Sequence, residues 1–150
     1  MQDKLESDLK VAMLAGDKQR AEVLRGLKNA LQYEAVAQAS ADRQLSDEQI
    51  QKVAAREAKK RQEAADIYQK AGENQRAQAE LAEKKIIEEY LPEQLDEAAI
   101  LVLVKDECGK ISNPSMQNMG QIIGAVKARA GAGADGAVIA KLVKEALEKQ

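Results

Sequence analysis

The stretch ARAGAGADGAVIAKLVKEAL, residues 128–147, shows in twenty residues how this chain is built. A helical segment runs into two closely spaced glycines, Gly131 and Gly133, and a second helical segment follows Asp135. Glycine tolerates the positive φ angles found where helices end, and an aspartate before a helix accepts hydrogen bonds from its first backbone amides. The stretch therefore predicts two helices joined at a tight corner.

The same corner has a second interpretation, because a glycine-rich loop before a helix can bind phosphate. A phosphate loop also needs a Lys-Ser/Thr pair after its glycines, and residues 131–136 (GAGADG) are not followed by one. Asp135 moreover places a carboxylate where a phosphate would bind. We therefore favour a turn, with Gly131, Gly133, Asp135 and Gly136 as structural residues.

Caps, apolar stripes and helix breakers alternate in this way along the whole chain. Apolar residues recur with helical spacing almost throughout, and Gly16, Gly72 and Gly109 mark helix ends. Ser46 and Gln49 form the pattern of a capping box, after a loop predicted at Gln38–Leu45. Seven helices are predicted, beginning after Asp3, Asp17, Ser46, Gly72, Asp96, Asn113 (with Pro114 as the first helical residue) and Asp135.

Pro92 divides these helices into two groups, because the residue before a proline is pushed away from helical dihedral angles. We expect an all-α protein with an N-terminal bundle of about four helices, residues 1–91, and a C-terminal three-helix domain, residues 92–150. The composition favours helix with a thin core, since it is rich in alanine and only 2% aromatic.

Gly120 and Gly124 lie four residues apart in the sixth predicted helix. Each glycine costs about 1 kcal/mol in a helix interior, so the pair needs a reason. We expect another backbone to pass close to this face, which predicts that Gly120→Leu destabilises the domain by overpacking. The same close approach could serve a partner instead.

Residues that carry enzyme chemistry are scarce. The chain has no histidine, and its one cysteine, Cys108, falls on the apolar face of its helix. The carboxylates alternate with basic residues at helical spacing, as Glu57 does with Arg61, which is typical of a solvated surface. We predict no catalytic residues, no metal site and no cofactor, and we do not expect an enzyme that works alone.

Charge and hydropathy narrow the possible partners. The net charge is −2, and the segment after Pro92 carries 7 basic and 8 acidic residues, so no broad basic surface is expected. No apolar run approaches the length of a membrane span, and we expect a cytoplasmic protein with no membrane contact. Any nucleic-acid contact would have to be a local patch. The basic residues near the glycine-rich corner are Lys127, Arg129, Lys141 and Lys144, which either keep the surface soluble or contact RNA.

Four segments of the chain form a familiar series: VLRGLKNALQYEAV (23–36), LSDEQIQKVAAREAKKRQEAADIYQKAG (45–72), AELAEKKIIEEYLPEQLDEAAI (79–100) and NMGQIIGAVKARAGAGADGAVIAKLVKEAL (118–147). Together and in this order, they resemble the GatB/YqeY family over nearly the whole chain. The family's glycines and acidic cap correspond to Gly120, Gly131, Asp135 and Gly136. Ile123 stands where many relatives carry methionine, which fits a core position.

The resemblance implies a helical bundle followed by a three-helix domain related to the tail of GatB, a component of the glutamine-dependent aspartyl/glutamyl-tRNA amidotransferase. That tail is implicated in holding tRNA, while the catalytic chemistry lies elsewhere. Our first hypothesis is thus a non-catalytic tRNA-associated accessory protein. The alternative is a protein-interaction module that docks amidotransferase subunits or another protein without binding RNA directly.

Overall fold

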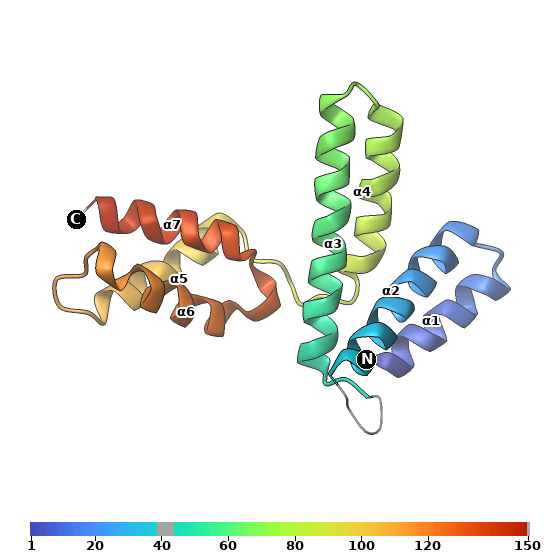
Figure 1. Cartoon of the computed structure of the whole chain (residues 1–150), viewed down its shortest axis with the longest axis horizontal. Coiled ribbons are helices and arrows are strands. Elements are labelled where there is room, and N and C mark those ends of the chain that lie inside the picture. The colour runs from blue at the N-terminus through green and yellow to red at the C-terminus, as the bar shows by residue number, and fades with distance from the viewer. Residues whose placement is uncertain (39–43, 150) are drawn as a thin grey trace. The chain divides into compact units, whose positions relative to one another are not determined.

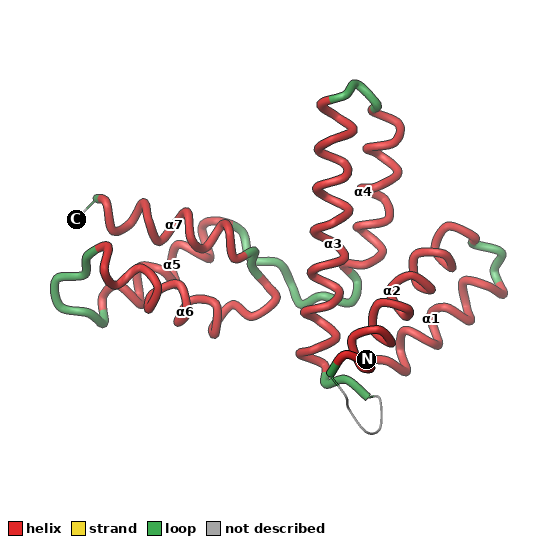
Figure 2. Tube along the Cα trace, in the orientation of Figure 1, coloured by secondary structure: helices red, strands yellow, loops and turns green. Residues whose placement is uncertain are grey.

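The computed structural model describes residues 1–38 and 44–149, and within them every regular element is a helix (Figures 1 and 2). There are seven α-helices and two short 3₁₀ helices in this part of the chain, so the predicted all-α fold is confirmed. Of the predicted loop Gln38–Leu45, residues 39–43 lie outside the described residues. The chain divides into two compact units, Met1–Pro92 and Glu93–Gln150. That each unit folds alone, as a domain would, stays a prediction.

The first unit consists of two antiparallel helical hairpins. Helices α1 (Gln2–Leu14) and α2 (Lys18–Ala37) form one hairpin, and α3 (Asp47–Lys70) and α4 (Asn74–Glu88) form the other (Figure 1). Helix α2 packs against both members of the second hairpin. The leucines of α1 and α2 supply most of the large side chains of the shared core, to which α3 and α4 add isoleucine, valine and alanine. The most buried large members of the core are Leu5, Leu24, Leu27, Leu31, Val53 and Ile87.

The second hairpin extends well beyond this core. The core takes its last residue of α3 at Ala58 and its first of α4 near Ile86, and between them only Ala65 and Ala77 are buried. Charged groups link the outer parts of the two helices, because Arg61 of α3 lies 3.3 Å from Glu83 of α4. The outer half of the hairpin is therefore held by small apolar contacts and by ion pairs.

The ion pair between Arg61 and Glu83 corrects the expected pairing of Glu57 with Arg61 along α3. Glu57 does not pair with Arg61 along the helix but with Lys60, at 3.1 Å. Arg61 instead faces Glu80 and Glu83 of the neighbouring helix. Two carboxylates across the hairpin attract the guanidinium more strongly than one carboxylate on its own helix.

The end of α4 is fastened to the first hairpin by polar groups. The buried Tyr90 hydroxyl donates a hydrogen bond to Asp8 of α1, and burial together with this bond raises the pKa of Tyr90. Arg20 of α2 makes a two-point ion pair with Glu89, at 2.8 and 3.1 Å. Lys4 lies over the Tyr90 ring, 4.9 Å from its centroid. These contacts hold the chain in place just before Pro92.

The second unit is a bundle of three helices, α5 (Glu97–Gly109), α6 (Met119–Ala130) and α7 (Gly136–Glu148), with 3₁₀ helices η1 (Met116–Asn118) and η2 (Gly131–Gly133) on either side of α6. Each α-helix of the unit contacts both others. Their apolar stripes meet in one core, whose most buried members are Ile100, Val104, Ile122, Val126, Ile139 and Val143.

Most of the predicted helix starts are confirmed by side-chain caps. Asp17 accepts from the Arg20 amide, Asp96 accepts from the Ala99 amide, and Ser46 forms the predicted capping box. Each cap satisfies a backbone donor that has no partner within its helix.

Two predicted starts are wrong. The first helix begins at Gln2 rather than after Asp3, which lies within the first turn, where its negative charge complements the helix dipole. Asn113 does not cap the sixth helix either. It adopts a positive φ of 53° in the preceding turn, and Ser115 with Asn118 forms a capping box at η1, the 3₁₀ helix that leads into α6.

Candidate nucleic-acid interface

The glycine-rich corner joins α6 to α7 and serves as a turn. Gly131 follows the end of α6 with φ 56° and ψ −135°, a backbone conformation that residues with a Cβ rarely adopt. Asp135 begins α7 by accepting a hydrogen bond from the Ala137 amide at 2.9 Å. The carboxylate thus occupies the amino end of α7, where an anion would otherwise be attracted.

Gly133 fulfils a role that differs from the expected one. Its φ is not positive, so conformational freedom does not explain it. It is buried against the chain that enters the unit, where an added Cβ would lie 3.1 Å from the carbonyl oxygen of Glu93. Its own carbonyl accepts from the Leu95 amide at 2.8 Å. Glycine is needed here because two backbone segments lie in contact.

Gly136 makes room for a lysine. A Cβ at this position would lie 3.0 and 3.2 Å from Cε and Nζ of Lys127. The side chain of Lys127 therefore crosses from α6 to the first turn of α7, next to Asp135. One of the four candidate basic residues is thereby placed at the corner itself.

The expectation for Gly120 and Gly124 is wrong. Both residues are exposed, and a Cβ built on either would meet nothing within 4 Å. Within residues 1–38 and 44–149, no backbone packs against this face of α6, so overpacking by Gly120→Leu is not expected. Packing among these described residues does not require the two glycines.

These glycines belong to a longer bare strip. Gly120, Gly124 and Ala128 recur at helical spacing along the outer face of α6, Gly131 follows the end of the helix, and all four are exposed. None carries a side chain larger than a methyl group. The helix backbone is therefore open to close approach from outside over about two turns.

Arg129 is held by carboxylates of α5. Its guanidinium pairs with Asp106 and, at 3.1 Å, with Glu107. Hydrogen bonds first to Asp106 and then to Glu107 raise the pKa of Arg129. The pKa of Glu107, whose side chain is 10% exposed, is lowered by a hydrogen bond from Lys110 and then by Arg129. Arg129 is therefore mainly a link between α5 and α6.

Lys141 and Lys144 lie on the exposed face of α7. Lys144 is 4.0 Å from Glu148, which is a weak surface pair. No ion pair involves Lys141 anywhere in residues 1–38 and 44–149. Both ammonium groups extend into solvent, so an anionic partner could reach them.

The four candidate basic residues are not one cluster. Lys127 and Arg129 are two residues apart on α6, which places them about 200° apart around the helix. Lys127 reaches toward α7, whereas Arg129 reaches toward α5. The structure therefore joins Lys127 to the corner, leaves Lys141 and Lys144 on α7, and separates Arg129 from all three.

The remaining chemistry of the described residues is limited. Cys108 is 5% exposed and burial raises the pKa of its thiol, so the reactive thiolate is disfavoured. No three potential ligands lie together in the described ranges to hold a metal ion. Nor does any helix there combine the length and the hydropathy needed to cross a membrane.

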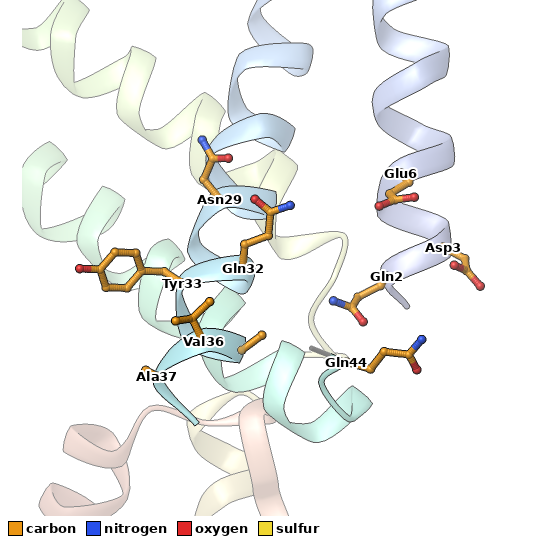
Figure 3. Close-up of a pocket in the computed structure, with 10 residues that line it drawn as sticks. Gln2, Asp3, Glu6, Asn29, Gln32, Tyr33, Val36, Ala37 and Gln44 are labelled. Atoms are coloured by element: carbon orange, nitrogen blue, oxygen red, sulfur yellow. The ribbon is translucent and has the colours of Figure 1, made fainter. Parts of the chain in front are cut away.

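A concavity between α1 and α2 was not predicted from the sequence. It has a volume of about 900 Å³ and lies between the amino end of α1 and the carboxyl end of α2 (Figure 3). Tyr33 and Val36, which are 82% and 61% exposed, stand on the α2 side, and Asp3 and Glu6 stand on the α1 side. The sequence does show Tyr33 and Val36 three residues apart on one predicted helix, a spacing that places them on the same face and could have indicated an apolar patch there.

Two comparisons with known proteins bear on this chain. A family model described as Yqey-like protein matches residues 2–147, nearly the entire sequence. No curated protein matches the chain.

Proposed function

Because this chain belongs to the YqeY-like family, whose domain is found in the C-terminal region of GatB and in stand-alone YqeY proteins, we propose that it is a tRNA-associated accessory protein. In this proposal the second unit contacts the phosphate backbone of tRNA and performs no catalysis of its own. Phosphate contacts need only basic groups held on a rigid face, and they specify position rather than sequence.

The bare strip on α6 is the observation that carries this proposal. Glycines inside a helix lower its stability. Among the described residues nothing packs closely on Gly120 or Gly124, so no packing contact offsets this loss. Such a cost is explained when a partner outside the chain must come close to the helix backbone. A nucleic-acid backbone is one partner of the right shape, since its phosphates approach small residues and backbone groups directly.

The charge near the strip supports the same proposal. Lys127 borders the strip at the corner, and Lys141 and Lys144 extend from α7 in the same unit. Arg129 contributes less, because a phosphate would have to compete with Asp106 and Glu107 for its guanidinium. With a net charge of −1 after Pro92, the unit should bind weakly, and a partner protein would supply the rest of the affinity.

The role of the strip in tRNA binding can be tested by placing larger side chains on it. Gly120→Gln with Gly124→Gln would place two side chains on the exposed face without touching the core. We expect the double variant to keep or raise its unfolding midpoint, since glutamine is a better helix former than glycine. We expect it to lose about fivefold to a hundredfold in affinity for bulk tRNA, as would follow from the loss of close contacts worth about 1–3 kcal/mol.

Gly26 provides the matched control for this experiment. It lies inside α2, is exposed, and has nothing within 4 Å of its Cβ position. Gly26→Gln should therefore leave tRNA affinity unchanged. Equal affinities for the wild type, the α6 variant and the Gly26 variant would refute a role for the strip.

A second candidate function, a protein-interaction module, is favoured by the concavity between α1 and α2. Large exposed apolar groups such as Tyr33 are typical of interface centres. The carboxylates of Asp3 and Glu6 would select a partner segment that carries basic residues. If Tyr33→Ala abolishes a protein complex while tRNA affinity is undetectable at low salt, this second function replaces the first.

A further inference from the structure

A second groove, in the C-terminal unit, is formed by α5 and α7. It has a volume of about 570 Å³, and its apolar lining comes from Leu101 and Cys108 of α5, Ile111 after it, and Leu142 and Ala146 of α7. The lining recurs at helical spacing on both helices. Two neighbouring apolar stripes on helices in contact form a surface against which a further helix can pack.

This groove lies away from α6. On α5, Asp106 and Glu107 face α6 through their pairs with Arg129, whereas Leu101 and Cys108 lie on a different side of the helix. Leu101, Ile111 and Ala146 remain only half-buried there. The three-helix bundle therefore leaves one apolar seam uncovered, and a fourth helix would complete it.

Charge indicates what kind of helix would fit. Lys105 and Lys149 line the groove together with one acidic residue, Glu145. Across the described parts of the chain, no ion pair involves either lysine. The groove is thus locally positive in a segment whose net charge is −1. A partner with carboxylates beside its apolar stripe would satisfy both lysines.

We infer that the α5–α7 groove docks an amphipathic helix of a partner protein, with leucine-sized side chains in the seam and Asp or Glu residues facing Lys105 and Lys149. A helix is favoured over a small ligand because apolar side chains from two helices line the groove and lysines lie beside them, as in grooves that bind amphipathic helices. The inference does not rest on the proposed tRNA contact, since that contact involves the outer faces of α6 and α7.

Two synthetic helical peptides of about 18 residues would test the charge preference. They would share one leucine and alanine stripe and differ only in flanking residues, glutamate in one and lysine in the other. Isothermal titration with the full chain should give about three- to tenfold tighter binding of the glutamate peptide, since only its carboxylates can form exposed ion pairs with Lys105 and Lys149.

Charge reversal gives the decisive comparison. Lys105→Glu with Lys149→Glu should invert the preference, so that the lysine peptide binds more tightly. Lys141→Glu with Lys144→Glu changes the net charge equally, but on the exposed face of α7, and should leave the preference unchanged. Leu101→Gln should weaken both peptides at least about tenfold, because a polar group then faces the apolar seam.

Cys108 reports whether a peptide covers the groove, because it is the only cysteine in the chain and lines the groove. Its thiol is buried and reacts slowly in the free protein, so the rate is compared with and without peptide. A bound peptide should slow its reaction with a thiol reagent several-fold. The inference is wrong if neither peptide binds at millimolar concentration, or if charge reversal leaves the preference unchanged. It is equally wrong if bound peptide leaves the thiol reaction rate unaltered, or if the groove is covered by a second copy of the chain, detected as a dimer that Leu101→Gln dissociates.

Discussion

At the scale of single residues, the glycines of the C-terminal unit serve different purposes. Gly131 supplies a positive φ, Gly133 permits contact between two backbone segments, and Gly120 with Gly124 leaves a helix face bare. The sequence could indicate that each glycine had a cost but not which of these reasons applied. Spacing along one helix does not reveal whether a neighbour covers that face, since the neighbour comes from a distant part of the chain.

Replacing the α6 glycines by alanine should stabilise the protein. Gly120→Ala and Gly124→Ala each add a methyl group in open space and lower the conformational entropy of the unfolded chain, a gain of up to about 1 kcal/mol per site. Urea unfolding would measure this gain in the free energy of unfolding, with Gly26→Ala as a reference for an exposed helix glycine. A loss of stability at Gly120 or Gly124, with a gain at Gly26, would mean that something packs on α6 after all.

The carboxylate of Glu107 should make stability depend on pH. Lys110 and Arg129 lower the pKa of Glu107 in the folded state below the value of about 4.3 for an unperturbed glutamate. The stabilisation is therefore fully present above that value and is lost as the pH falls through the lower, folded-state pKa.

Thermal unfolding at pH 7 and at pH 3 would measure this effect. The decrease in unfolding midpoint from pH 7 to pH 3 should be smaller for Glu107→Gln than for the wild type. Glu145→Gln, on the exposed side of α7, is the matched control and should behave as the wild type does. A fall of the same size in all three proteins would show that the Glu107 pairs do not contribute.

At the scale of elements, most helix starts could be predicted from the sequence, because they depend on interactions between residues close together in the chain. Asp17, Ser46, Asp96 and Asp135 begin their helices because a cap acts on backbone amides only two or three residues away. Pairing across helices was not predictable in this way. Nothing near Arg61 in the sequence indicates that Glu83 would be its partner, and the same holds for Arg129 and Asp106.

The hairpin of α3 and α4 should be stable in its inner half and labile in its outer half. Between Ala58 of α3 and Ile86 of α4 only Ala65 and Ala77 are buried, so little apolar surface opposes local opening. Hydrogen exchange should show lower protection for residues 62–80 than for Leu24–Leu31 of α2. Uniform protection along the hairpin would indicate that a further contact holds its outer half.

At the scale of the whole molecule, the two units have separate apolar cores, the first centred on the leucines of α1 and α2 and the second on Ile122, Val126 and Val143. The candidate site residues lie in the second unit, and the sequence had singled them out by type and neighbourhood. Their arrangement was not predictable, since the side on which Lys127 or Arg129 reaches depends on helices that meet only in the fold.

We propose that the second unit folds alone. A fragment of residues 93–150 retains all nine buried residues of its core, together with the contact between Leu95 and Gly133. It should show a helical circular dichroism spectrum and a cooperative thermal transition. A fragment that is helical only when residues 1–92 are added would contradict independent folding.

The tRNA contact is the central claim, and the salt dependence of binding tests it most directly. Each phosphate contact releases counterions, so the logarithm of the association constant should fall linearly with the logarithm of salt concentration. Titrations of tRNA binding would compare the wild type with Lys141→Ala/Lys144→Ala. We predict weak binding at low salt for the wild type, and a slope shallower by about two units for the variant, with no change in preference among tRNAs. Binding that is undetectable at low salt, or a slope that both substitutions leave unchanged, would contradict the account.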